Sequence, residues 1–378
     1  MSQLSIPCSV YRGGTSRGVF FNKRDLPENI ELQKKLFMAG IDAYNPSQID
    51  GLGSGTSHTS KVCVISKSEV NGADVDYTFY QVGIGKEIVD DKGTCGNLMA
   101  AVGAFAVDEG YIAVDSSVDN VEVSVFNTNI KKMLKIKVPV INGNAKVSGD
   151  YLMPGINKPG AKFSVSILTP GGGKTGSTQP LGDRYTLNTK TKVYEVSFVD
   201  IVNPFVFVSS HDLGIEGTEL NAELSLKKSL LEELEEIRTE MAVKSGLCRT
   251  IEEARQFPSV PKIAIVSEPM DYITSSGKLI KQDEVDVVAR MLSMGKFHRT
   301  FAGSGLYNIA GAAILSGTIP NQYAKQMYGN EERVIRIGHP EGIAKVRIAL
   351  TEDGRDVRYV GIDRTARRIM KGDLFIPE

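Results

Sequence analysis

The sequence predicts an α+β protein with two pseudo-equivalent domains, each a curved β-sheet or barrel wrapped around one central α-helix. Three observations predict this fold: many short runs of β-branched and apolar residues, two Ala/Gly-rich segments that lack a polar face, and a chain of 378 residues. Because single hydrophobic cores rarely grow beyond roughly 250–300 residues, this length suggests two domains. A helix that is apolar on every side is a buried helix, so the strands have to surround it.

Short extended runs dominate the chain. They alternate or stay apolar over a few residues between Gly, Pro, Asn or Asp, which is typical of strands. The runs lie at 18–21, 61–65, 121–126, 134–140, 163–168, 194–202, 205–208, 262–266, 334–338 and 344–350. Helical spacing is present at 32–40, 97–109, 219–246 and 283–294.

Two small-residue segments resemble one another. Residues 96–110 read GNLMAAVGAFAVDEG and residues 303–317 read GSGLYNIAGAAILSG, and a constant offset of 207 aligns their first and last glycines. Chance similarity between two core helices is the alternative explanation. We predict a duplication, with an N-terminal domain over residues 1–183 that holds the catalytic residues. The second domain covers 184–378, and its last strand can cross back to the first domain.

Composition and charge argue against several function classes. A formal net charge of −1 gives no electrostatic reason to expect nucleic acid or membranes as partners. No apolar run reaches the ~18–20 residues of a membrane span, and the first residues lack the pattern of a signal peptide. Four cysteines without a CxxC pair predict reduced thiols in the cytoplasm, with neither a disulfide framework nor a metal site. The sequence allows a homo-oligomer without predicting one.

The segment GGGKTG at 171–176 resembles a phosphate-binding loop only in part. That motif requires a glycine five residues before Gly173, where this chain has Leu168. The residues that follow also look extended rather than helical. We therefore interpret the segment as a linker or as the rim of an active site.

Cys95 is the first candidate for chemistry. It comes directly before the first Ala/Gly-rich helix, where unpaired N–H groups and the helix dipole lower the pKa of a thiol. Most lone cysteines fill a core, but the nearby Asp90 and Thr94 are polar. Gly96 lets a substrate approach the backbone, and Asn97 adds a polar side chain. We therefore predict that Cys95 is functional.

The equivalent position of the second small-residue segment is Ala302. Gly303 and Ser304 follow it and offer backbone and hydroxyl donors. One helix end thus carries a thiol, whereas the other carries only donors. If the two ends face each other, they form an anion-binding pocket with acid–base chemistry on one side, which suits a carboxylate.

Other candidates lie in polar loops. In GGTSRG at 13–18, backbone N–H groups, Ser16 and Arg17 can bind a carboxylate, or the segment is an ordinary hairpin loop. Lys61 follows a Gly/Ser/Thr-rich loop, and it is either solvated or a desolvated general base, since burial lowers the pKa of a lysine. Asn203 precedes a strand, where it can bind a carboxylate or cap a turn.

Five segments together resemble the family that includes 2-methylaconitate cis–trans isomerase, 3-methylitaconate Δ-isomerase and 4-oxalomesaconate tautomerase. They are RGGTSRGVFF, GLGSGTSHTSKV, GTCGNLMAAVGAF, GGGKTG and MGKFHRTFAGSG. The family is similar in fold to diaminopimelate epimerase, in which two cysteines face each other from two helix ends. Cys95 matches the first cysteine, whereas Ala302 departs from the second. The resemblance implicates Lys61 in its TSK motif and implies that Ser16 and Asn203 are polar substrate ligands.

The resemblance implies an isomerase that needs no cofactor and moves or rotates a C=C bond in an unsaturated di- or tricarboxylate by allylic proton transfer. Lys61 and Cys95 would share the proton transfer, in an order that the sequence leaves open. The predicted ligands of the small polycarboxylate are Ser16, Arg17, Gly96, Asn97, Asn203, Gly303 and Ser304. An amino-acid epimerase or racemase of the same fold is one alternative, against which Ala302 argues. A carboxylate-binding protein without activity is the other.

Overall fold

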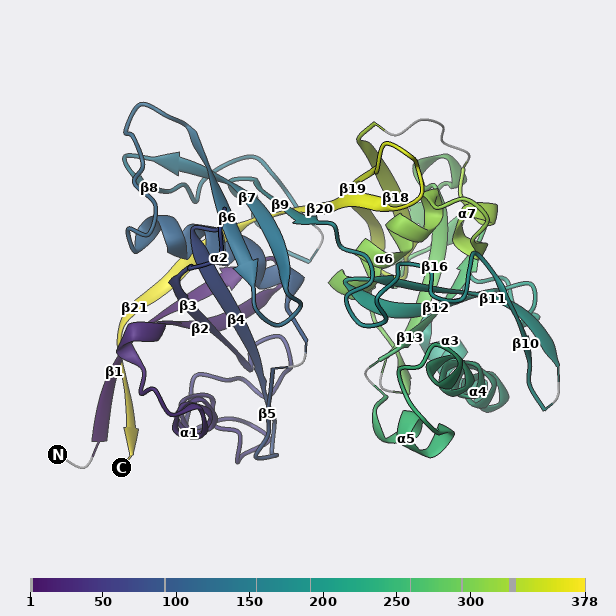
Figure 1. Ribbon diagram of the computed structural model, residues 1–378, viewed down its shortest axis with the longest axis horizontal. Helices are drawn as coiled ribbons and strands as arrows, with labels where there is room; N and C mark the ends of the chain where they lie inside the picture. The colour runs from purple at the N-terminus through teal and green to yellow at the C-terminus, as the bar shows by residue number, and fades with distance from the viewer. Residues whose placement is uncertain are drawn as a thin grey trace. The chain divides into compact units, whose positions relative to one another are not determined.

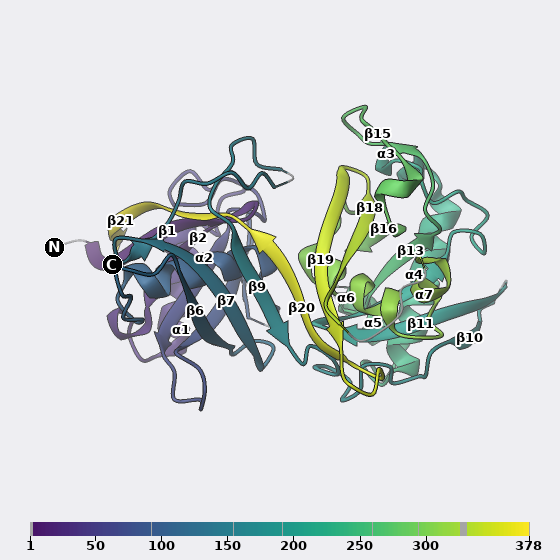
Figure 2. The same ribbon diagram turned by 90° about the horizontal axis from the view of Figure 1, so that it is seen from above.

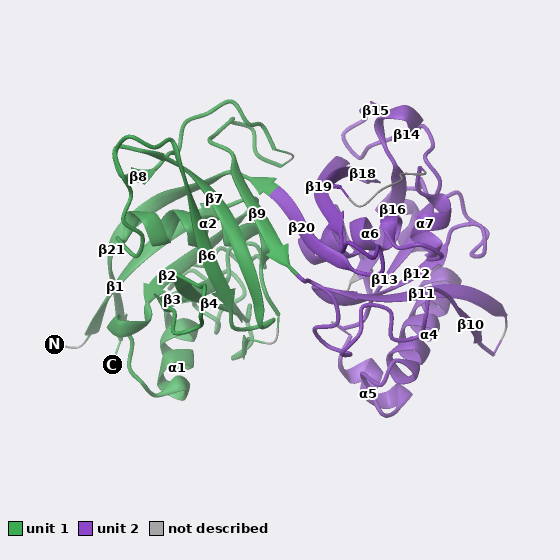
Figure 3. Ribbon diagram, turned by 45° about the horizontal axis from the view of Figure 1, so that its top comes forward, with its two compact units in different colours: residues 1–168, 363–378 green, residues 169–362 purple. Residues whose placement is uncertain are grey.

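The computed structural model describes residues 3–91, 93–153, 155–190, 192–258, 260–293, 295–325 and 331–377. The chain divides into two compact units (Figure 3). Unit 1 comprises Met1–Leu168 and Asp363–Glu378, and unit 2 comprises Thr169–Ile362. The C-terminal segment of the chain thus belongs with the N-terminal unit.

Unit 1 is built on one curved sheet (Figure 1). Its strands are β1 (Gln3–Gly13), β2 (Ser16–Asn22), β3 (Lys61–Lys67), β4 (Val75–Val82), β5 (Val89–Asp90), β6 (Asn120–Asn127), β7 (Lys132–Ile141), β8 (Asn144–Ala145), β9 (Phe163–Leu168) and β21 (Ala366–Pro377). Hydrogen bonds order the longer strands β21-β1-β2-β3-β4-β6-β7-β9. The pairs β2–β3 and β4–β6 are parallel, and the other neighbours in this order are antiparallel.

The two ends of the chain lie side by side in unit 1. Strand β21 pairs antiparallel with β1 from Gln3↔Pro377 to Gly13↔Ala366, and Figure 2 shows both strands along the same edge. This pairing explains why the last residues of the chain are part of the N-terminal unit.

The helices of unit 1 lie on opposite faces of its sheet. They are α1 (Ile30–Ile41) and α2 (Gly96–Asp108), with a short 3₁₀ turn η1 (Lys23–Asp25). Phe20 packs against Phe105 of α2, whereas its neighbour Phe21 stacks on Phe37 of α1. Successive side chains of a strand point to opposite faces, so α1 and α2 cover different faces. Each helix supplies the crossover that a parallel pair of strands requires.

Helix α2 is the central helix of unit 1 (Figure 1). Every residue from Leu98 to Val107 is buried, and the helix contacts β1, β2, β6, β7, β9 and β21. A Cβ added at Gly103 would lie 2.7 Å from Ile136 Cγ2. Small residues are therefore required where the strands approach the helix most closely.

Unit 2 repeats this arrangement. Its strands are β10 (Tyr185–Asn188), β11 (Val193–Ile201), β12 (Asn203–Ser209), β13 (Lys262–Ser267), β14 (Tyr272–Ile273), β15 (Leu279–Ile280), β16 (Val287–Ser293), β17 (Lys296–Phe297), β18 (Arg333–His339), β19 (Gly342–Leu350) and β20 (Val357–Arg364), which belongs to unit 2 up to Ile362. The main order is β10-β11-β12-β13-β16-β18-β19-β20, in which β12–β13 and β16–β18 are parallel. The succession of strand directions is the same as in unit 1, which supports a duplication.

The helices of unit 2 complete the correspondence. They are α3 (Asn221–Leu226), α4 (Lys228–Lys244), α5 (Ile251–Gln256), α6 (Gly303–Ile314) and α7 (Ile319–Tyr323), with a 3₁₀ turn η2 (Gln282–Glu284). Helix α6 is buried from Gly305 to Ala313 and contacts β11, β12, β18 and β19. Helix α4 packs Leu234 and Ile237 on a separate core with the strands. The predicted fold, a curved sheet around one buried helix in each half, is confirmed.

Two of the predicted helices differ from the structure. Residues 283–294 were expected to be helical, but Val287–Ser293 form strand β16, which lies between β13 and β18; Met294 lies outside the described residues. The apolar residues of this short segment fit either a helix or a buried strand, and here the strand is formed. The single helix expected over 219–246 is divided into α3 and α4 at Lys227, whose ψ of 79° is not helical.

Among the described residues, none of the helices has the length and apolar character needed to cross a membrane. Within the same part of the chain, His, Cys, Asp and Glu side chains form no group of three or more that could hold a metal ion.

Candidate active site

The N-terminus of α2 places Cys95 at the end of the helix. Cys95 is the N-cap, with extended backbone angles, and its carbonyl accepts hydrogen bonds from Leu98 and Met99 N–H at 3.1 and 3.3 Å. The first N–H groups of a helix have no partner within the helix. Gly96 and Asn97 therefore present backbone donors beside the sulfur, and the Cys95 side chain itself is largely buried.

The glycine pair of the first hairpin allows β1 and β2 to reach this helix end. Gly13 pairs with Ser16, so Gly14 and Thr15 form the turn. A Cβ on Gly13 would lie 2.6 Å from Asn97 O, and one on Gly14 would lie 2.5 Å from Asn97 Oδ1. Gly14 also has a φ of +52°, which favours glycine. The segment is a hairpin loop that lies against α2. Its predicted role in binding a carboxylate stays a prediction.

Ser16 lies between the thiol and the amide of the helix end. The Cys95 Sγ–H donates to Ser16 Oγ at 3.9 Å. Asn97 Nδ2 donates to Ser16 Oγ at 3.4 Å and to Thr15 Oγ1 at 3.0 Å. Three of the residues predicted from the sequence, Ser16, Cys95 and Asn97, thus form one hydrogen-bonded cluster.

Arg364 fixes the orientation of Asn97. Its Nε donates to Asn97 Oδ1 at 2.9 Å, so the amide nitrogen must face Thr15 and Ser16. Sequence reasoning missed Arg364, which lies 267 positions from Asn97. A sequence pattern cannot link Arg364 to Asn97, because the two residues meet only when the C-terminal segment of the chain joins unit 1.

Lys61 is the first residue of β3 and is buried rather than solvated. Its Nζ donates to Gln81 Oε1 at 2.5 Å and lies 5.1 Å from the centre of the Phe79 ring. The solvated alternative is therefore wrong, while the role of general base stays a prediction. Sequence reasoning also missed Gln81, which is directly opposite Lys61 on β4.

The pKa values of Cys63 and His58 are affected by the predicted catalytic residues. Burial raises the pKa of the Cys63 thiol, the nearby Cys95 raises it further, and Lys61 lowers it. Burial likewise lowers the pKa of His58, and the charge of Lys61 lowers it further. Lys61 and Cys63 are two positions apart on β3 and so face the same side of the sheet, and the pKa of Cys63 responds to both Lys61 and Cys95.

Arg17 connects the hairpin to the Gly/Ser/Thr-rich loop. Its Nη2 donates to Leu52 O at 3.1 Å, and its backbone N–H donates to His58 O at 2.9 Å. The structure thus gives Arg17 an anchoring contact, and its role as a substrate ligand stays a prediction.

The remaining predicted ligands belong to unit 2. Asn203 is buried at the start of β12, and its carbonyl accepts a hydrogen bond from Asn308 Nδ2 of α6 at 2.7 Å. Gly303 and Ser304 are the first residues of α6, directly after the N-cap Ala302. Asn203 therefore occupies in β12 the place that Ser16 occupies in β2, at the start of the second strand of the hairpin.

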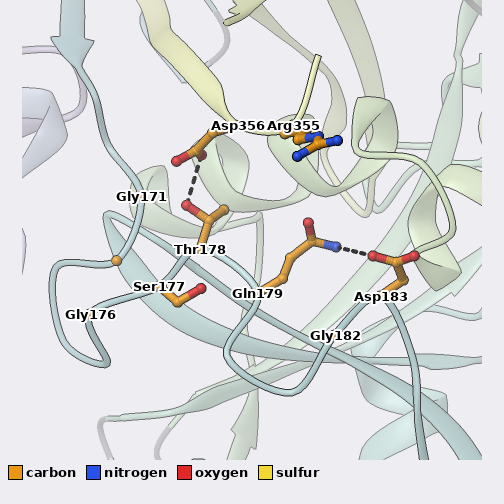
Figure 4. A pocket seen from close by; sticks show the side chains of 10 residues that line it. Gly171, Gly176, Ser177, Thr178, Gln179, Gly182, Asp183, Arg355 and Asp356 are labelled. Atoms are coloured by element: carbon orange, nitrogen blue, oxygen red, sulfur yellow. Dashed lines mark hydrogen bonds between the residues drawn. The ribbon is translucent and has the colours of Figure 1, made fainter. Parts of the chain in front are cut away.

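The GGGKTG segment belongs to a polar pocket of unit 2. This pocket has a volume of about 430 Å³ and is shown in Figure 4. Its lining residues are Gly171, Gly172, Gly176, Ser177, Thr178, Gln179, Gly182, Asp183, Arg355 and Asp356. Thr178 donates to Asp356, and Gln179 donates to Asp183.

The loop of this pocket binds a carboxylate of the protein itself. The backbone N–H groups of Lys174 and Thr175 both donate to Asp200 Oδ2 at 2.8 Å, and Thr175 Oγ1 donates to the same oxygen. In a phosphate-binding loop these N–H groups would bind the phosphate, but here they bind Asp200. The structure therefore agrees with the rejection of a phosphate-binding loop.

Comparisons with known proteins show where this chain belongs. The family model described as PrpF protein matches residues 3–377. The chain is 38% identical to 3-methylitaconate isomerase of Eubacterium barkeri, over 99% of this chain and 98% of that protein. It is 35% identical to 2-methyl-aconitate isomerase of Shewanella oneidensis, over 100% of this chain and 98% of that protein.

A solved structure gives the same result. The crystal structure of methylitaconate-delta-isomerase matches with a TM-score of 0.90 at 38% identity, over 100% of this chain and 97% of that one. The resemblance inferred from the five motifs is confirmed. The chain belongs to the PrpF protein family.

Proposed function

We propose that this protein is a cofactor-independent isomerase that moves or rotates the C=C bond of an unsaturated di- or tricarboxylate by allylic proton transfer. That it is an isomerase follows from its full-length similarity to isomerases of the family. The observation that carries the proposed chemistry is the cluster of Cys95, Ser16 and Asn97 at the N-terminus of α2. Substrates of the methylitaconate, methylaconitate and oxalomesaconate types are the candidates.

The reaction is a balanced shift of one proton. A base removes a proton from the carbon next to the C=C bond, and the C–H electron pair forms a new C=C bond. The electrons of the old double bond move toward the carboxylate and give a dienolate. An acid then returns one proton to the carbon next to the carboxylate. Rotation within the dienolate before the proton returns to its original carbon gives cis–trans isomerisation instead.

The helix end is suited to stabilise the dienolate. Negative charge builds up on carboxylate oxygens, and donors fixed in advance at these oxygens lower the barrier. The Gly96 and Asn97 backbone N–H groups, together with the positive end of the α2 dipole, supply such donors. We also propose that the carboxylate groups of the substrate are bound by Arg17 of unit 1 and by Asn203, Gly303 and Ser304 of unit 2.

Lys61 and Cys95 are the proposed proton-transfer groups. A thiol and an amine can each take and return a proton, and general acid–base catalysis contributes about 10²–10⁴-fold in rate. The burial of Lys61 and the placement of Cys95 at a helix end support this assignment. The order in which the two act stays open, and we propose that the protein works in the cytoplasm and without a cofactor.

The alternative of an amino-acid epimerase is less well supported. Inversion of a stereocentre by opposed thiols requires a second thiol at the other helix end, and the N-cap of α6 is Ala302. A methyl group cannot exchange a proton with the substrate. No contact in the described residues favours a binding protein without activity over the isomerase.

A spectrophotometric assay tests the proposal. Purified protein is incubated with each of the three acids, with and without a chelator, and absorbance of the conjugated double bond is followed. We expect turnover of one acid that the chelator leaves unchanged, and at least about 100-fold loss in Lys61→Ala and Cys95→Ser. Near-full turnover in both variants would refute the site, and binding of all three acids without turnover would refute the reaction.

A further inference from the structure

We propose that Gln81 is a positioning residue for Lys61, which sets both the place of the Lys61 amine and the pH range in which it works. This inference rests on the proposed function, in which Lys61 transfers a proton. Gln81 lies outside the sequence motifs. It is identified by the pairing of β3 with β4, which places it opposite Lys61.

Gln81 and Lys61 are direct partners in an antiparallel ladder. Lys61 is the first residue of β3, and the register pairs it with Gln81 of β4. Side chains of directly opposed residues extend from Cβ atoms only about 4.5–5.5 Å apart. The Lys61 side chain therefore runs alongside the Gln81 amide, and the distance of 2.5 Å between Nζ and Oε1 marks a close contact.

The amide of Gln81 can face Lys61 in one orientation only. Its Nε2 donates to Ser60 O at 2.8 Å and to Ser57 O at 3.3 Å, both in the loop before β3. The nitrogen is thus directed to carbonyl groups of the loop. The oxygen is left for Lys61, and an amide oxygen accepts hydrogen bonds but cannot donate them.

Phe79 restricts Lys61 from a second direction. Its ring centre lies 5.1 Å from Nζ, a distance at which an aromatic face attracts a cation. A lysine side chain is otherwise a flexible four-carbon chain. Gln81 and Phe79, both on β4, therefore hold the amine of Lys61 at one point.

Charged and titratable groups face Lys61 from the loop before β3, from β3 itself and from the elements beside it. His58 precedes it in the loop, Cys63 follows it on β3, and Cys95 interacts with Cys63 from the cap of α2. Asp90 of β5 lies opposite Gln81. The direct hydrogen-bond partner of Nζ is Gln81 Oε1.

Two substitutions of Gln81 test the inference. Gln81→Leu removes the acceptor at similar size, and we expect kcat to fall about 10- to 100-fold with KM changed less than about threefold, since a positioning residue acts through Lys61 and not through substrate binding. Gln81→Glu places a carboxylate beside the amine. Because an opposite charge favours the protonated amine, we expect the limb of the pH–rate profile that Lys61 sets to move up by about one pH unit or more.

Gln48 provides a matched control. It is a buried glutamine that anchors the same loop: its Oε1 accepts from Gly55 N and Ser60 Oγ at 2.8 Å each, and its Nε2 donates to Gly83 O rather than to Lys61. Gln48→Leu should loosen the loop and lower the melting temperature while the pH–rate profile keeps its position. If Gln81 acts only by holding the loop, both leucine variants will behave alike, and the inference is refuted.

Lys61→Ala separates this inference from the proposed function. If Lys61→Ala retains turnover, the proposed role of Lys61 fails. If Lys61→Ala is inactive but Gln81→Leu and Gln81→Glu both keep the wild-type kcat and pH–rate profile, only the inference about Gln81 fails. Loss of kcat in Gln81→Leu together with a shifted profile in Gln81→Glu supports it.

Discussion

The N-termini of α2 and α6 are equivalent in backbone and different in chemistry. Both helices begin with glycine, at positions separated by the same offset of 207 that aligns their sequences, and both are buried within sheets of the same strand directions. Yet the N-cap is Cys95 in one unit and Ala302 in the other. A duplicated scaffold has thus kept its backbone while one helix end holds a reactive side chain and the other offers donors alone.

The residues near the two helix ends have also diverged. Lys61 begins β3 beside Gly18, where an added Cβ would lie 2.9 Å from Leu98 Cδ1 and 3.2 Å from Lys61 O, so the glycine allows close packing at this position. The equivalent Lys262 begins β13 and pairs with Phe205, whose ring stacks on Phe301 at 6.4 Å. Burial lowers the pKa of Lys262. The residue beside the first lysine of the strand is thus a glycine in unit 1 and an aromatic residue in unit 2.

The largest expected effect separates the two helix ends directly. Cys95→Ala should lower kcat by about 10²–10⁴-fold, because it removes a proton-transfer group. Ala302→Ser, which changes the equivalent position of unit 2, should stay within about threefold of the wild type. Steady-state kinetics on the accepted acid measures both. Equal losses in the two variants would show that the two ends do not differ in function.

A smaller effect distinguishes the units by their response to acid. Burial, followed by the charge of Arg290, lowers the pKa of His339 in unit 2 to about 4. The unfolded chain binds this proton near pH 6.5 and the folded one does not, so stability is full above pH 6.5 and falls as the pH drops toward 4. The loss amounts to about 3 kcal/mol. In unit 1 the sequence has one histidine, His58, whose pKa is lowered by partial burial but less than that of His339.

Hydrogen exchange followed by mass spectrometry measures this difference in each unit. After correction for intrinsic exchange rates, protection of α6 should fall between pH 6.5 and 4 more steeply than protection of α2. His339→Gln should remove most of the excess loss. If α2 and α6 lose protection in parallel in both proteins, the acid response does not originate at His339.

Much of the fold could be predicted because its signals are local. The Ala/Gly-rich helices have no polar face, and most of the apolar runs are strands. Sequence analysis allowed a last strand to cross back to the first domain, but no predicted run covered β21, because its residues are largely exposed and its place depends on pairing with β1. Strand β16 was mistaken for a helix because the apolar residues of a segment this short can match helical spacing and still form a buried strand.

The residues of the candidate site likewise fall into those with a local sequence signal and those placed by long-range contacts. Cys95 and Asn97 are neighbours of a helix start, and Ser16 lies in a glycine-rich turn, so their residue types and positions already pointed to a site. Gln81 and Arg364 become visible only with the register of β3–β4 and the return of the chain to unit 1. Contacts made by register and by long-range pairing are set by the tertiary fold, and no local pattern contains them.

Solvent deuterium uptake tests the central claim most directly, that Lys61 and Cys95 move a proton on an unsaturated carboxylate. The reaction is run in D₂O, and the product is examined by proton and deuterium NMR. The account predicts deuterium at an allylic carbon of the wild-type product, since thiol and amine protons exchange with solvent, and no uptake with Cys95→Ala or Lys61→Ala. Complete isomerisation by the wild type without any deuterium in the product would contradict it.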